Sequence, residues 1–271
     1  MIRKRLFYDG VSFTADTDDI TIIQPRYIDA IHISLSCLQN GATAPSLSDI
    51  LSILNKVQVK LTGKIVTELT GQDILAYNCL VENRSIKYLV PANDNEMGLV
   101  EGLKLPLQLA PGEHVLSVRF LHQSVSTIDT EKLSFSTLES DEALAERHIE
   151  MPTFSFTPPS TGSYNIAMDS TFGGDVIGFL VYSTTIPTTT SETTTVAKVR
   201  IKVGGDIVFE DNWNNLSAQT FYPEESTLRS ILDNYVYIDF RKAPISGGAR
   251  TEFEVYSDDT NAVKIIPIVL V

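Results

Sequence analysis

The sequence predicts an all-β chain made of two tandem β-sandwiches with a few short helices. One observation behind this prediction is a repeat: KVQVKLTGKIV at 56–66 returns as KVRIKVGGDIV at 198–208 in a chain of 271 residues. Another is a series of short segments with alternating apolar residues, separated by Gly, Pro, Asn and Asp, which is typical of β-sandwiches. The spacing of the repeat, about half the chain, indicates a duplicated domain. We therefore expect one sandwich in residues 1–150 and a second in residues 151–271.

Both copies of the repeat have the pattern of a β-hairpin. Apolar residues at 57, 59 and 61 alternate with polar ones at 56, 58 and 60, and the second copy alternates in the same way. This period of two is that of a strand with one buried and one hydrated face. Thr62-Gly63 and Gly204-Gly205 then supply a turn, because glycine adopts positive φ without a Cβ clash. The likeness continues without a gap to Tyr77/Gln219, and the identical pairs are Lys56/Lys198, Val57/Val199, Lys60/Lys202, Gly63/Gly205, Ile65/Ile207, Val66/Val208, Glu68/Glu210 and Ala76/Ala218.

Strand-like segments before and after the hairpins occur in the same order in both halves. The segments that precede the hairpins are Asp29–Ser36 and Asp175–Ser183. Two later strands of the first half are expected to correspond, by their order along the chain, to two of the second half. These pairs are Leu116–Phe120 with Val236–Phe240, and Leu133–Phe135 with Phe253–Val255. A last strand is expected after a turn at Asp258–Asn261.

Helices and loops account for the remaining segments. Apolar residues at 47, 50, 51 and 54 predict a short amphipathic helix, and Thr70 has the position of a helix cap. A third helix is expected at Asp141–His148, between the halves. Met151–Ser163, which holds three prolines, is expected to be an extended connection. Thr184–Thr195, with eight threonines in twelve positions, predicts an exposed loop in the second domain.

Charge and hydropathy exclude several classes of protein. A formal net charge of −13, spread evenly over both halves, lacks the basic footprint of nucleic-acid recognition, so we expect no specific nucleic-acid binding. No apolar run approaches the roughly 20 residues of a membrane-spanning helix. The N-terminus lacks the apolar stretch of a secretory signal. The cationic cluster that departs from this acidic background is Arg3, Lys4 and Arg5.

The sequence contains no familiar catalytic or metal-binding motif. HExxH, GxSxG, the Walker loop and GxGxxG are all missing. We therefore expect no enzyme activity and no cofactor. The histidines, expected to be strand or surface residues, are His32, His114, His122 and His148.

Three further sets of residues have both a structural and a functional interpretation. Acidic clusters at 16–19, 93–96 and 258–259 are candidate ligands for structural Ca²⁺, but Asp and Asn also favour turns, and we expect turn residues. Cys37 and Cys79 are expected to be buried free thiols, because neither a dense cysteine framework nor a CxxC motif is present. Trp213 is expected to pack beneath a loop rather than serve as a ligand platform.

The repeated segments resemble the double jelly-roll major capsid proteins of tailless icosahedral viruses with an internal membrane, of the corticovirus and tectivirus type. The resemblance rests on KVQVKLTGKIV with TGQDILAYN behind it, and on KVRIKVGGDIVFEDNW followed by LDNYVYIDF and ARTEFEVYSDD. It implies two jelly rolls per chain and a structural protein of the virion capsid, assembled in the host cytoplasm. It also implies homotrimers that form pseudo-hexagonal blocks, contact neighbouring trimers and minor capsid or penton proteins, and tile the shell over the membrane.

Two other functions stay open at this point. One is a two-domain carbohydrate- or receptor-binding β-sandwich protein, which would need an exposed aromatic platform or a calcium site on its loops. The other is a β-sandwich hydrolase whose site no motif reveals. For Arg3, Lys4 and Arg5, we weigh a solvated terminus against an arm that contacts the membrane or a neighbouring subunit.

Overall fold

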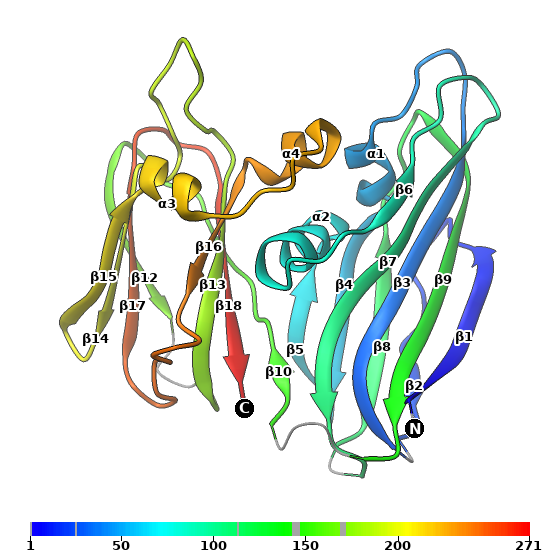
Figure 1. Cartoon of the computed structure of the whole chain (residues 1–271), viewed down its shortest axis with the longest axis horizontal. Helices are drawn as coiled ribbons and strands as arrows, with labels where there is room; N and C mark the ends of the chain where they lie inside the picture. Colours follow the sequence, from blue (N-terminus) through cyan, green and yellow to red (C-terminus); the bar gives the residue numbers. More distant parts are fainter. Residues whose placement is uncertain (1, 25, 113, 143–146, 169–171) are drawn as a thin grey trace. The chain divides into compact units, whose positions relative to one another are not determined.

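The computed structural model describes residues 2–24, 26–112, 114–142, 147–168 and 172–271. The chain divides into two compact units, Met1–Glu150 and Met151–Val271 (Figure 1). Each unit is built mainly from antiparallel strands, and short helices lie in the connections between them.

The first unit contains two antiparallel sheets. Its strands are β1 (Ile2–Ser12), β2 (Ile20–Ile22), β3 (Tyr27–Gln39), β4 (Leu54–Leu61), β5 (Lys64–Leu69), β6 (Lys87–Leu89), β7 (Met97–Leu109), β8 (Leu116–His122), β9 (Ile128–Ser140) and β10 (Ile149–Glu150). One sheet has the order β1-β9-β3-β7-β6, and the other has the order β2-β8-β4-β5.

The second unit also contains two sheets. Its strands are β11 (Phe154–Phe156), β12 (Gly162–Met168), β13 (Asp175–Ser183), β14 (Lys198–Val203), β15 (Asp206–Asn212), β16 (Tyr235–Asp239), β17 (Thr251–Ser257) and β18 (Val263–Leu270). One sheet has the order β18-β13-β16, with β11 paired to β18. The other has the order β12-β17-β14-β15.

The two units share the strand order of a jelly roll. β1-β9-β3-β7 corresponds to β11-β18-β13-β16, and β2-β8-β4-β5 corresponds to β12-β17-β14-β15. The repeated sequences form the hairpins β4–β5 and β14–β15, which take the same place in their sheets, with the first strand inside and the second at the edge. The predicted double jelly roll is therefore confirmed, and so is the equivalence of the two hairpins.

The hairpins form because the sequence alternation matches the pleat of a strand. The apolar residues of β4 and β14 with no exposed surface are Val57, Val59, Val199 and Ile201. Burying a side chain of this size stabilises the fold by about 1.5–3 kcal/mol. Gly63 (φ 84°) and Gly205 (φ 98°) close the two turns in a conformation that side chains disfavour. Each hairpin also has a β-bulge at the same place, just after Val59 and Ile201.

The sequence pattern does not predict β7, and the matching of the later strands is wrong by one strand for that reason. β8 corresponds to β17 rather than β16, and β9 corresponds to β18. Gly102 and Pro106 lie within β7 and conceal its alternation, because both residues are unusual inside strands. Proline has no N–H to donate to a neighbouring strand, and Pro106 is tolerated because the edge of β7 away from β3 is unpaired there, since β6 pairs only with residues 99–101.

Two of the helices form where the sequence predicts them. α1 (Leu47–Ser52) and α2 (Gly71–Ala76) each begin with a capping box, made by Ser46 with Asp49 and by Thr70 with Asp73. α2 continues into the π-helical turn η1 (Tyr77–Val81). The helices α3 (Trp213–Gln219) and α4 (Ser226–Leu232) are additional to the prediction.

The segments between and within the halves differ in part from expectation. Of the helix expected at Asp141–His148, residues 143–146 lie outside the described residues. Met151–Ser163 is more than an extended connection, because it contains β11 and the start of β12. The threonine-rich loop lies between β13 and β14 as predicted. Its end is not exposed, however, since Thr195 is buried and donates a hydrogen bond to Asp259 (3.1 Å).

Each unit has its core between its two sheets. In the first unit, Phe120 of β8 and Phe135 of β9 make an edge-to-face contact across the sandwich, with ring centroids 5.1 Å apart. In the second unit, Phe179, Phe253 and Trp213 belong to one cluster of buried residues. Trp213 is 3% exposed, which confirms that it packs in the interior.

Gly71→Ala is expected to lower the free energy of unfolding by about 1–3 kcal/mol, because it overpacks the contact between α1 and α2. A Cβ atom at residue 71 would lie 2.3 Å from the backbone oxygen of Leu51, which cannot rotate away. Denaturant unfolding measures the loss. Gly173→Ala is the matched control, because its Cβ atom would meet only a side-chain atom of Val271 at 3.5 Å. Equal stability of the two variants would contradict this tight packing.

Candidate functional site

The repeated hairpins carry the same ion pair on their outer faces. Lys56 Nζ lies 2.6 Å from Glu68 Oε1 across β4 and β5. Lys198 Nζ lies 2.5 Å from Glu210 Oε1 across β14 and β15. The duplication has therefore kept a cross-strand charge pair together with the buried apolar row. Partly exposed pairs of this kind add little stability, so their main effect is to fix the positions of charges on the outer face.

In the second unit this pair extends into a larger network across four strands, β12, β14, β15 and β17. Arg200 Nη1 lies 3.2 Å and Lys202 Nζ lies 2.9 Å from Glu254 Oε2 on β17. Ser163 of β12 donates a hydrogen bond to Glu254 Oε1. Arg200 Nε also contacts Glu210 Oε2. We call this group the outer-face network; its members are Ser163, Lys198, Arg200, Lys202, Glu210 and Glu254.

The outer-face network holds its carboxylates in the ionised form. The hydrogen bond from Ser163, followed by that from Lys202, lowers the pKa of Glu254 to about 2. Hydrogen bonds from Lys198 and Arg200 lower the pKa of Glu210. With three cations and two carboxylates, the network has a net charge of +1 at neutral pH.

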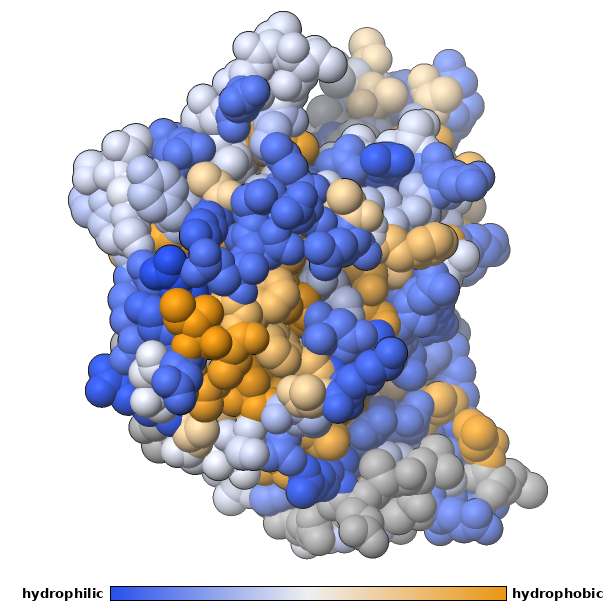
Figure 2. Space-filling model, turned by 60° about the vertical axis from the view of Figure 1, so that its left-hand side comes forward, coloured by the Kyte–Doolittle hydropathy of each residue, from blue (hydrophilic) through white to orange (hydrophobic). Residues whose placement is uncertain are grey.

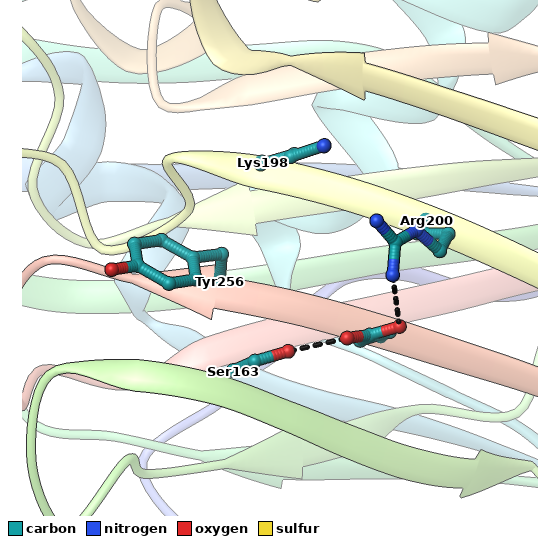
Figure 3. A pocket seen from close by; sticks show the side chains of 5 residues that line it. Ser163, Lys198, Arg200 and Tyr256 are labelled. Carbon is teal, nitrogen blue, oxygen red and sulfur yellow. Dashed lines mark hydrogen bonds and ion pairs between the residues drawn. The ribbon is translucent and has the colours of Figure 1, made fainter.

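An open hollow of about 230 Å³ lies over the outer-face network. It is lined by Ser163, Lys198, Arg200, Glu254 and Tyr256, from β12, β14 and β17 (Figure 3). Figure 3 shows Arg200 and Ser163 directed at the carboxylate between them, while the Tyr256 ring lies further along the sheet. Because its cations already have carboxylate partners, the hollow suits contact with mixed-charge protein side chains better than capture of a free anion.

The second unit also exposes apolar side chains. Figure 2 shows an apolar patch surrounded by hydrophilic side chains on the face that its view brings forward. The large apolar residues of this unit that are exposed are Ile207 (55%), Val208 (48%), Tyr256 (48%) and Phe221 (66%). Apolar side chains near a polar, charge-paired sheet face are typical of a protein–protein contact surface.

The structure places Arg3, Lys4 and Arg5 in strand β1, so this segment is not a frayed terminus. β1 pairs with β9 along one side and forms the edge of its sheet. Arg5 Nη1 donates to the backbone oxygen of Ile23 (3.0 Å) and lies 3.8 Å from Glu139. Arg3 lies 3.8 Å from Asp141, and Lys4 is exposed. These cations belong to the first unit.

The candidate calcium ligands serve as hydrogen-bond acceptors in turns. Asp94 accepts from the backbone N–H groups of Gly41 and Asn95, and Glu96 accepts from those of Ala92 and Asn93. Asp259 accepts from that of Asn261. Within the part of the chain that the structure describes, no three His, Cys, Asp or Glu residues are grouped as a metal site requires.

The remaining candidate residues have structural environments. Cys37 and Cys79 are free and buried, as predicted, and burial raises the pKa of each thiol to about 11. His122 lies inside the first unit, with Nε2 3.0 Å from Glu131 Oε2. His148 Nε2 lies 3.2 Å from Glu150 Oε1. In the described ranges, no helix is long and apolar enough to cross a membrane.

The sequence interpretation missed the outer-face network. Its signal is present in the charged residues at 198, 200 and 202 and the acidic ones at 252 and 254, which alternate with buried residues of β14 and β17. These two strands become neighbours only through the jelly-roll order, so the wrong matching of β17 concealed the contact between Arg200 and Glu254.

The strand order and the duplicated hairpin define a double jelly-roll protein. No family model and no curated protein matches the sequence. The solved structure of the STIV MCP resembles the chain with a TM-score of 0.74 and 15% identity, over 100% of this chain and 97% of that one. A structure of Sulfolobus Turreted Icosahedral Virus matches with a TM-score of 0.75 and 15% identity, over 100% of this chain and 90% of that one. The major capsid protein P2 of bacteriophage PM2 matches with a TM-score of 0.61 and 14% identity, over 100% of this chain and 98% of that one. The chain therefore has the fold of the double jelly-roll major capsid proteins, and the resemblance predicted from the sequence is confirmed.

Glu254→Gln is expected to remove part of the acid sensitivity of the protein. The pKa of Glu254 falls from its ordinary value of 4.5 to about 2 in the folded protein, so its ion pairs stabilise the fold above pH 4.5 and are lost as the pH falls toward 2. The variant should lose no more than about 1 kcal/mol at neutral pH, because solvent screens the pairs. Between pH 4.5 and 2 its unfolding free energy should fall less steeply than that of the wild type.

Urea unfolding at several pH values measures this difference. Glu192→Gln is the control, because Glu192 lies in the exposed loop between β13 and β14. Identical pH profiles for wild type and Glu254→Gln would show that the network does not hold this carboxylate ionised.

Proposed function

We propose that this chain is the major capsid protein of an icosahedral virus, with a structural role and no catalytic reaction. The observation that carries the proposal is the likeness of both jelly rolls, over the whole chain, to major capsid proteins. At 15% identity the fold has persisted without sequence similarity, so the shared property is the shape of the two sandwiches. The virion capsid is accordingly the proposed location of the protein, after assembly in the host cytoplasm.

We further propose that the chain forms homotrimers whose six jelly rolls make one pseudo-hexagonal block. The outer-face network and the hollow beside Tyr256 support this proposal, because they offer fixed charges, hydrogen-bonding groups and an aromatic surface on one broad sheet. Charge pairs contribute register and specificity, while the buried area supplies most of the affinity. The blocks would contact one another and minor capsid or penton proteins, and would tile the shell over an internal membrane.

Strand β1 is the proposed contact with that membrane or with a neighbouring subunit. Its cations lie beside exposed aliphatic side chains: Ile2 is 65% exposed, and Ile23, which accepts the hydrogen bond from Arg5, is 74% exposed. Aliphatic and cationic side chains together suit the surface of an anionic bilayer. Each cation near such a surface is worth about 1 kcal/mol, so several chains acting together are needed for stable binding.

Light scattering of the purified protein is expected to give a mass three times the 29.9 kDa of one chain. Tyr256→Asp should shift the population toward monomers, because it places an unpaired charge in the hollow of a contact surface. Thr189→Asp is the matched control, since Thr189 is exposed in the loop between β13 and β14. A wild type that stays monomeric at high concentration would contradict the trimer.

Trimers are expected to float with anionic liposomes and to float less with neutral ones. The combined variant Arg3→Ala, Lys4→Ala and Arg5→Ala should lose most of this difference, whereas Lys87→Ala, at an exposed cation of β6, should keep it. Equal flotation of the two variants would assign β1 to a subunit contact or to solvent instead of the membrane. Thermal unfolding of both variants checks that the ion pairs of Arg3 and Arg5 are not required for folding.

A further inference from the structure

The turns of the two repeated hairpins each expose an isoleucine to solvent. We call residues 62–66 the first tip and residues 204–208 the second tip. Ile65 is 45% exposed in the first tip, and the identical Ile207 is 55% exposed in the second. An isoleucine stabilises a fold mainly through the apolar area that it buries. The repeat has therefore kept this residue at a place where the folded chain leaves about half of it in water.

A second exposed aliphatic side chain accompanies each isoleucine. In the second tip it is Val208, which is 48% exposed. In the first tip the equivalent Val66 is buried, but Val115, which is 60% exposed, lies beside the turn. The backbone oxygen of Val115 accepts a hydrogen bond from the N–H of Thr62 (2.8 Å). Each tip thus presents a small apolar surface, which suits a contact with another protein surface.

The cations on the strand opposite each isoleucine already have acidic partners. Lys60 is the cross-strand neighbour of the isoleucine in the first tip, and Lys202 is that of the isoleucine in the second. Lys60 Nζ lies 2.8 Å from Asp19, and Lys202 Nζ lies 2.9 Å from Glu254. The charge that distinguishes each tip is therefore that of the residue just before its isoleucine.

That residue is a lysine in the first tip and an aspartate in the second. Lys64 and Asp206 take the same place in the repeat, and both are exposed. No ion pair joins either of them to a residue in the described part of the chain. Arg250, whose backbone oxygen accepts a hydrogen bond from the N–H of Gly204 (3.0 Å), pairs with Glu252 (2.6 Å). The first tip is thus cationic and the second anionic, around the same apolar residue.

We propose that the first tip of one copy of this chain docks on the second tip of another copy. Lys64 then lies beside Asp206 of the next copy, and the exposed aliphatic side chains of the two tips pack together. Contact between two first tips or two second tips would bring like charges together, which opposes those arrangements. Because each copy offers one tip of each kind, the contact repeats head to tail and closes into a ring, as a trimer requires. The choice of a second copy rests on the proposed self-assembly, and the opposite charges select the pairing.

Exchange of the two charges tests this pairing by sedimentation at fixed ionic strength. Lys64→Asp makes both tips acidic and Asp206→Lys makes both basic, so each variant should associate roughly tenfold or more weakly than the wild type. The double variant restores opposite charges and should recover most of the loss. Lys242→Asp and Glu192→Lys are the matched controls, because they make the same changes at an exposed turn and an exposed loop, and both should associate like the wild type.

Two results of this comparison would overturn the proposal while leaving the capsid function intact. One is equal association of the wild type and both single variants. The other is a double variant that associates as weakly as the single ones. A wild type that never associates would contradict both this inference and the proposed function. Thermal unfolding of every variant checks that a loss of association is not a loss of folding.

Cross-linking identifies which tips meet. A chain with Ile65→Cys and a chain with Ile207→Cys are produced together, so that mixed assemblies form, and are treated with a short bis-maleimide. The natural thiols should not react, because burial raises the pKa of Cys37 and of Cys79 to about 11. Cross-linked dimers that form only when both variants are present support the proposal. Dimers of either variant alone, or assemblies without any cross-link, contradict it.

Discussion

The burial of one face of a central strand is the constraint on which the rest of the structure depends. In β4 and in β14, alternate residues have no exposed surface, and their neighbours face outward at fixed spacing. Because side chains alternate with period two, a slip of one residue would place lysines in the core and valines in water. The same constraint therefore determines the register of the hairpin, the packing of the two sheets and the positions of the outer charges.

The two units keep this constraint and differ on their outer faces. Glu68 and Glu210 take the same place beside Lys56 and Lys198. Two residues further along the same strands the outer faces differ. Gln58 of β4 lies opposite Arg119 of β8 in the first unit, whereas Arg200 of β14 lies opposite Glu254 of β17 in the second. The two sheets therefore share a pattern of buried residues and present different charges on their outer faces.

Much of the fold could be predicted from the sequence, because the hairpins, β13, α1 and α2 depend on local patterns. The predicted segment Asp175–Ser183 coincides with β13, and Thr70 caps α2. β7 could not be recognised from Gly102 and Pro106, since the tolerance of a proline depends on which side of the strand is paired. The wrong matches of β8 and β9 followed from that omission.

The candidate site could be predicted less well, because it is a property of strand order. Ser163 and Glu254 are 91 positions apart and meet only when β12 pairs with β17. The sequence did single out Arg3, Lys4 and Arg5 by their charge. Their place in a paired edge strand required the partner strand β9, which lies more than a hundred residues away.

Electron microscopy of the purified protein and of its source particles tests the central claim most directly, because it displays the assembly itself. The account predicts pseudo-hexagonal blocks of threefold symmetry, each with six jelly-roll densities, that fit side by side in an icosahedral shell. Dispersed single chains under all assembly conditions, or particles whose shell contains no such blocks, would contradict it.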